Sequence, residues 1–111
     1  MNPQQKLDAL VAQHVLKWRN EGTKWFHPEA DKEVTLQPFS VDLALAWQVA
    51  EKICEQGYRL QIDGSRIWQA RFYKSVAHTL ETHAFSATSR EPASAICLAA
   101  LAVKGIQTSP Y

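Results

Sequence analysis

Apolar side chains near the start of the chain recur with the period of an α-helix. Leu7, Leu10, Val11, Val15 and Trp18 fall on one face of such a helix, and polar residues occupy the other face. This spacing predicts a helix over residues 3–19, followed by a break at Asn20, Glu21 and Gly22.

Two later stretches have the same helical period. In the first, Ser40 can cap a helix whose apolar positions are Leu43, Ala46, Trp47, Ala50, Ile53 and Cys54, with Gly57 after its end. We therefore expect a helix over residues 41–56. The second stretch begins near Glu91-Pro92, is rich in alanine and ends at Lys104-Gly105, which predicts a helix over residues 91–104.

Between these two helices the period changes to two, as in β-strands. Alternating apolar and polar residues predict strands over residues 58–63, 66–73 and 76–87. Gly64-Ser65 suits a two-residue hairpin turn between the first two strands, and Tyr73-Lys74-Ser75 would form the next turn. The predicted sheet is therefore antiparallel.

The hairpin carries large apolar side chains on both of its predicted faces. A two-residue turn places Leu60 and Ile62 on one face with Ile67, and it places Trp68, Ala70 and Phe72 on the other. A sheet of this kind needs cover on both sides, either from helices or from another subunit. The expected fold class is α+β, with three helices packed on a small antiparallel sheet as an α/β/α-type sandwich.

Residues 20–39 show no lasting period. They combine Trp25 and Phe26 with two prolines and several charges, so we expect an irregular loop containing at most one short strand. The acidic residues at 29, 31 and 33 in this loop indicate a solvated surface. The chain contains no repeat and no linker rich in Pro, Gly or Ser, which predicts a single domain over residues 1–111.

Charge and hydropathy exclude several classes of function. Lys and Arg total 12 against 11 Asp and Glu, so the chain lacks the basic excess of proteins that bind long nucleic acids. The N-terminus does not resemble a signal peptide, and no apolar stretch is long enough to span a membrane. We expect a cytoplasmic protein that binds neither a membrane nor long nucleic acid.

The residues that usually carry catalysis or bind metals are scattered. His14, His27, His78 and His83 lack metal-ligand spacing, and the glycines do not form a phosphate-binding loop. Cys54 and Cys97 lie in apolar helical patterns, which favours free buried thiols over a disulfide or a reactive thiol. We therefore predict a protein that is not an enzyme and has no metal and no cofactor.

A set of aromatic and cationic residues offers the best candidate chemistry. It comprises Trp25, Phe26, Arg59, Arg66, Trp68, Arg71, Tyr73 and Lys74. Such groups can stack on a base and hold a phosphate, so we predict a ligand-binding site formed by Trp25, Phe26, Arg66, Arg71, Tyr73 and Lys74. The alternative is that the tryptophans belong to the core and the arginines are solvated.

Several segments together resemble a known family. They are KLDALVAQHVLKW, PFSVDLALAWQVAEKI, the strand containing Trp68 and Phe72, and AICLAAL at residues 95–101. This arrangement is similar to the phage ABA sandwich domain family, over about residues 6–104. Phe39-Ser40, Ala46-Trp47 and residues 95–101 are its most specific pieces, and they carry architecture rather than mechanism.

The resemblance implies a compact sandwich encoded by a phage or prophage and acting in the host bacterial cytoplasm. By analogy with small phage proteins, it suggests an oligomeric sponge that sequesters a cyclic nucleotide or cyclic ADP-ribose type of immune signal. The expected partners are thus a small anionic nucleotide and further copies of the chain. The alternative is a protein-interaction module or inhibitor that docks on a host protein through Trp25, Phe26 and the nearby acidic residues.

Overall fold

The computed structural model describes residues 2–29, 32–75 and 82–106. Within them, three helices and two three-stranded antiparallel sheets confirm the predicted α+β class. The elements are α1 (Pro3–His14), β1 (Arg19–Glu21), β2 (Lys24–Phe26), β3 (Glu33–Val34), α2 (Leu43–Cys54), β4 (Arg59–Gly64), β5 (Trp68–Ser75), β6 (Thr82–Ser89) and α3 (Pro92–Val103). No helix in these ranges is long and apolar enough to cross a membrane.

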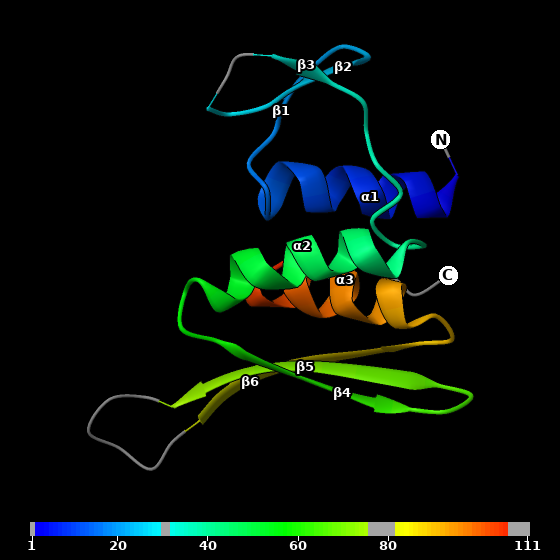
Figure 1. Cartoon of the computed structure of the whole chain (residues 1–111), viewed down its shortest axis with the longest axis vertical. Coiled ribbons are helices and arrows are strands. Elements are labelled where there is room, and N and C mark those ends of the chain that lie inside the picture. The colour runs from blue at the N-terminus through cyan, green and yellow to red at the C-terminus, as the bar shows by residue number, and fades with distance from the viewer. Residues whose placement is uncertain (1, 30–31, 76–81, 107–111) are drawn as a thin grey trace.

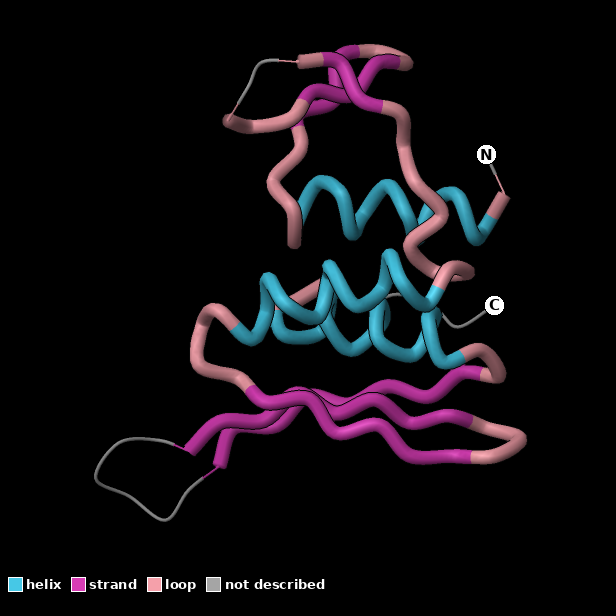
Figure 2. The backbone as a smooth tube through the Cα atoms, in the orientation of Figure 1, coloured by secondary structure: helices cyan, strands magenta, loops and turns pink. Residues whose placement is uncertain are grey.

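The two sheets lie at opposite ends of the molecule, with the helices between them (Figures 1 and 2). The small sheet β1–β3 is followed by α1, then by α2 and α3, and finally by the larger sheet β4–β6. In α3, every residue from Ala93 to Leu101 is buried. Its alanines allow α1, α2 and the larger sheet to pack closely around it, which makes α3 the centre of the core.

Local capping decides where the first two helices begin and end. Asn2 and Gln5 form a capping box at the start of α1. The helix ends at His14, earlier than predicted, because Lys17 adopts a left-handed backbone conformation with φ 63°. The N-cap of α2 is Asp42 and not Ser40, since Asp42 Oδ1 accepts hydrogen bonds from the Ala44 and Leu45 N–H groups at 2.9 and 3.3 Å.

The larger sheet has an apolar face and a polar face, so the prediction of two apolar faces was wrong. The β4–β5 loop contains three residues, Ser65–Ile67, because Gly64 continues the strand and pairs with Trp68. A Cβ atom at Gly64 would collide with the Ile67 carbonyl oxygen, so this close approach requires glycine. The changed register puts Leu60 opposite Phe72.

The helix-facing side of the sheet is consequently apolar. It includes Leu60, Ile62, Trp68, Ala70, Phe72, Phe85 and Ala87. The outer side carries Arg59, Gln61, Asp63, Gln69, Arg71, Tyr73, Ser86 and Thr88. Helices cover only the apolar side (Figure 1), and a polar outer face needs no second subunit to shield it.

The segment predicted as an irregular loop forms the small sheet β1–β3 instead. Its strands contain only two or three residues, too few for a detectable period. Trp25 in the middle strand is 6% exposed and belongs to the hydrophobic core, whereas its strand neighbours are more exposed. One buried tryptophan therefore anchors the small sheet.

The chain between the small sheet and α2 is tied to the helices by Phe39 and Ser40. Phe39 is fully buried, and its ring makes a T-shaped contact with the Trp18 ring at a centroid distance of 5.6 Å. The Ser40 N–H donates to Asp8 Oδ1 at 2.8 Å, and Ser94 Oγ donates to the Ser40 carbonyl oxygen at 2.7 Å. Ser40 thus joins α1 to α3 by way of this turn.

The third predicted strand of the larger sheet corresponds to β6, which extends two residues beyond the predicted end, to Ser89. β6 begins at Thr82, and the part of the prediction that covers residues 76–81 lies outside the described residues. The turn predicted at Tyr73–Ser75 was wrong, because these residues continue β5 and pair with Ala84, His83 and Thr82.

Candidate functional site

One end of β4 and β5 gathers cationic and aromatic side chains. Arg59 and Tyr73 are register partners on the outer face of the larger sheet. Arg71 lies two residues before Tyr73 on the same face, with its guanidinium carbon 4.9 Å from the Tyr73 ring centroid. The sheet therefore presents two cations beside one tyrosine ring.

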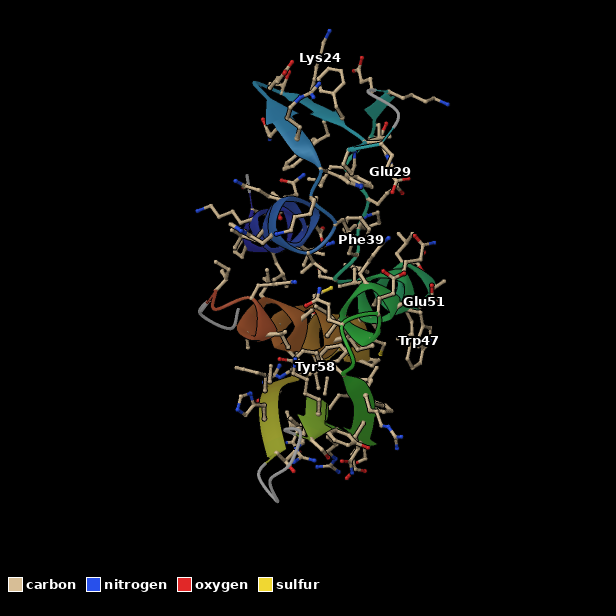
Figure 3. All side chains as sticks on the ribbon, turned by 90° about the vertical axis from the view of Figure 1, so that its left-hand side faces the viewer. Lys24, Glu29, Phe39, Trp47, Glu51 and Tyr58 are labelled. Atoms are coloured by element: carbon tan, nitrogen blue, oxygen red, sulfur yellow. The ribbon has the colours of Figure 1, made fainter. Side chains whose placement is uncertain are left out.

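Lys74 adds a third cation from the opposite face of the sheet. Because β5 alternates, Lys74 points to the helix side, where its Nζ lies 4.6 Å from the Tyr58 ring centroid. Tyr58 is held in place by an edge contact with Phe85 at a centroid distance of 6.2 Å. The position of Tyr58 among the sheet and helices is visible in Figure 3.

A pocket of about 470 Å³ opens where these two faces meet at the strand end. Its lining residues are Gly57, Arg59, Tyr73, Lys74 and Ser75. Among the residues that the structure describes, none of the three nearby cations, Arg59, Arg71 and Lys74, forms an ion pair with a carboxylate. Arg59 and Lys74 therefore give the pocket lining a positive charge, and Arg71 lies beside it against the Tyr73 ring.

The structure brings together only part of the predicted site. Tyr73 and Lys74 lie near the end of β5, and Arg71 lies in the middle of this strand with its guanidinium against the Tyr73 ring. Arg66 lies in the β4–β5 loop at the other end of the hairpin. At the usual rise of a strand, that separation is roughly 20 Å. We define the cationic strand end as Arg59, Arg71, Tyr73 and Lys74.

Trp25 and Phe26 lie in the small sheet, beyond the helices from the cationic strand end (Figure 1). Trp25 is buried, and the Phe26 ring is covered by the Arg19 guanidinium at 5.0 Å. Neither residue can contribute to a pocket formed by β4 and β5. Sequence reasoning left Arg59 out of the predicted site, although its pairing across the hairpin from Tyr73 follows once the register is known.

The remaining reactive groups serve the core or are solvated. Both cysteines are free, as predicted, but Cys54 is exposed rather than buried. Burial, with a smaller contribution from nearby Asp8, raises the pKa of the Cys97 thiol and disfavours a nucleophilic thiolate. Burial also raises the pKa of Asp8, while its contacts with Ser40 lower it in part.

Within residues 2–29, 32–75 and 82–106, no group of three His, Cys, Asp or Glu side chains could hold a metal ion. His27 Nδ1 accepts a hydrogen bond from the Glu29 N–H at 3.2 Å, and His83 lies on β6. The prediction that His78 lacks metal-ligand spacing concerns a residue outside the described ranges.

Comparison with known families shows which family has this architecture. The pattern of the family described as "Phage ABA sandwich domain" matches residues 9–101. The chain belongs to the phage ABA sandwich domain family. The match includes the second half of α1, all of α2, most of α3 and both sheets, so the resemblance predicted from the sequence is confirmed.

A solved structure has the same fold as this member of the phage ABA sandwich domain family. It is the crystal structure of a phage protein from Bacillus cereus ATCC 14579, with a TM-score of 0.78 and 17% sequence identity. The alignment covers 98% of this chain and 94% of that chain. None of the curated proteins matches the chain. At this identity the likeness establishes the fold, and the cationic strand end has to be interpreted from its own chemistry.

Proposed function

We propose that this phage-family protein is a non-catalytic binding protein that captures a small anionic ligand at the cationic strand end. The observation that carries the proposal is the pocket between Arg59, Tyr73 and Lys74, with Arg71 beside it. Guanidinium and ammonium groups suit phosphate oxygens, and the tyrosine ring offers a stacking surface. The pocket volume lies within the usual range for small-molecule sites.

The finer proposal concerns the identity of the ligand. A cyclic nucleotide or cyclic ADP-ribose type of signal combines phosphates with a flat base, the two features that cations and an aromatic ring complement. Sequestering such a signal in the host cytoplasm would counter bacterial anti-phage defence. Simple capture needs neither a nucleophile nor a general base, in keeping with the buried Cys97 and Asp8.

The structure removes the reason to expect a ligand pocket between subunits. A sheet with two apolar faces was the reason to expect a pocket between subunits, and the outer face is polar. We therefore place the ligand within a single chain. If copies of the chain associate to form a sponge, we propose that they do so through another surface.

The alternative, docking on a host protein through the aromatic loop, depends on Trp25 being accessible. Trp25 would have to be exposed to contact a host protein, but it is 6% exposed and holds the small sheet to the core. Large binding contributions usually come from side chains that enter a partner's pocket, which a buried residue cannot do. The geometry thus favours capture of a ligand over docking through Trp25.

The proposal can be tested by calorimetry and thermal shift with cyclic dinucleotides, cyclic trinucleotides and cyclic ADP-ribose isomers. Arg59→Ala and Arg71→Ala should each weaken binding about tenfold or more, as expected when a charge-assisted hydrogen bond is removed. Arg66→Ala is the matched control, because it removes the same charge from the far end of the same hairpin. Its affinity should equal that of the wild type.

The fate of the ligand separates capture from catalysis. A ligand recovered unchanged after denaturation of the complex supports sequestration, and a cleaved one indicates a phosphodiesterase. Absence of heat and of stabilisation with every compound would reject the proposed ligand class. Light scattering on the same samples gives the number of chains in each particle with and without ligand.

A further inference from the structure

An exposed side of α2 carries a row of residues at four-residue spacing. Leu43, Trp47, Glu51 and Glu55 follow one another along this row, one turn apart. Leu43 is 41% exposed and Trp47 is 46% exposed, although periodicity assigned both to the buried face. Val41, just before the helix, is also exposed. Exposed large apolar side chains one helical turn apart are typical of an interaction site.

The acidic end of the same row borders a pocket of about 450 Å³. Its lining residues are Leu16, Trp18, His27, Pro28, Glu29, Gln48, Glu51, Lys52 and Glu55. They come from α2, from the segment after α1 and from the loop after β2. Figure 3 shows Trp47, Glu51 and Glu29 on one side of the molecule, so the apolar row and the pocket share a surface.

The electrostatics of this pocket favour a cation. It contains three carboxylates, from Glu29, Glu51 and Glu55, against the single ammonium group of Lys52. Lys52 Nζ lies 3.8 Å from Glu55 Oε2 and so offsets only part of the negative charge. Glu51 and Glu55 also lie near the C-terminus of α2, where the helix dipole is negative and carboxylates are unfavourable. A bound guanidinium or ammonium group would relieve both effects.

The pocket also suits the aliphatic part of a long cationic side chain. Leu16 and Trp18 supply apolar walls beside the carboxylates. Lysine and arginine bury their methylene groups against such walls while the charged end reaches the acidic residues. The neighbouring Leu43 and Trp47 then remain available to apolar side chains of the same partner.

We infer that this α2 surface, consisting of Leu43, Trp47, Glu51, Glu55 and the adjoining pocket, is a docking site for a basic amphipathic segment of another protein. Apolar side chains of that segment pack on Leu43 and Trp47, and a lysine or arginine enters the pocket beside Glu51. Charge complementarity argues against a second copy of the chain as occupant, because two such surfaces would bring their carboxylates together.

A synthetic helical peptide with leucine on one face and arginine at neighbouring positions is the probe, and calorimetry is the readout. Trp47→Ala should weaken its binding about tenfold or more, the effect expected for a central aromatic anchor. The double variant Glu51→Gln and Glu55→Gln should weaken it severalfold and reduce its salt dependence. Matched controls are Ile67→Ala, another exposed apolar side chain, and Glu33→Gln, another exposed carboxylate.

Each outcome bears directly on the inference. Binding that is lost with Trp47→Ala, kept in both controls and absent for a peptide with glutamate in place of arginine supports it. The inference is overturned if Trp47→Ala leaves the peptide affinity unchanged, or if the glutamate peptide binds as tightly as the arginine peptide. A dimer by light scattering that Trp47→Ala dissociates would assign the surface to self-association instead. Spermine binding unaffected by Trp47→Ala, with no peptide binding, would reduce the site to a small-cation pocket.

Discussion

The two sheets of this protein differ in strand length and in how many apolar side chains they bury. The larger sheet has strands of six to eight residues and an apolar face covered by helices. The small sheet has strands of two or three residues and a single buried side chain, that of Trp25. The comparison teaches that one sheet is stabilised by a continuous apolar face, whereas the other depends on one anchor.

The largest expected effect is on the larger sheet. Phe72→Ala removes a fully buried ring from the centre of the apolar face and should lower the free energy of unfolding by about 3–5 kcal/mol. Chemical denaturation measures this loss. Arg71→Ala, the preceding residue on the polar face, should change the stability by no more than about 0.5 kcal/mol. Equal losses in the two variants would mean that the assigned faces are wrong.

A smaller and more local effect is expected in the small sheet. Trp25→Ala should cost about 1–3 kcal/mol, because the short strands can open without unfolding the helices. Hydrogen exchange should show lost protection at residues 19–26 and 33–34, while the Phe72 amide remains protected. Loss of protection throughout the chain would show that both sheets unfold together.

The smallest expected effect on stability concerns the hydrogen bond between Asp8 in α1 and Ser40 in the turn before α2. Burial raises the pKa of Asp8, so the folded state holds its proton to a higher pH than the unfolded state does. The contribution of Asp8 to stability is therefore full below the ordinary carboxyl pKa of about 4 and falls as pH rises towards the folded value.

Asp8→Asn tests this dependence, since its amide oxygen can still accept from the Ser40 N–H. Denaturation of both proteins between about pH 4 and pH 7 should show the wild type losing stability relative to the variant as pH rises. A difference that stays constant with pH would show that Asp8 does not titrate in this range.

The contrast between the sheets also explains which parts of the fold could be predicted. Helical periods located α2 and α3 to within a few residues, and alternation located β4 and β5. The register could not be predicted, because one residue more in the β4–β5 loop exchanges the faces of a strand and Gly64 fits either arrangement. The small sheet escaped detection because its strands are too short to show alternation.

The candidate site was predictable only in part, for a related reason. Arg71, Tyr73 and Lys74 are close in sequence, so any strand would keep them together. The pairing of Arg59 with Tyr73 depends on the register, and the burial of Trp25 depends on contacts from distant segments. Periodicity placed Trp47 in an apolar arc, but it cannot show which part of that arc lacks a neighbour.

The alanine-rich helix α3 has a consequence for how this fold tolerates change. It is buried from Ala93 to Leu101 and packs against α1, α2 and the larger sheet. An added methyl group in this region would therefore cause steric overlap with more than one of these neighbours. Outward-facing positions elsewhere carry no such restriction. Surface residues of this fold can therefore vary widely while the architecture is kept, provided that the buried residues of α3 stay small.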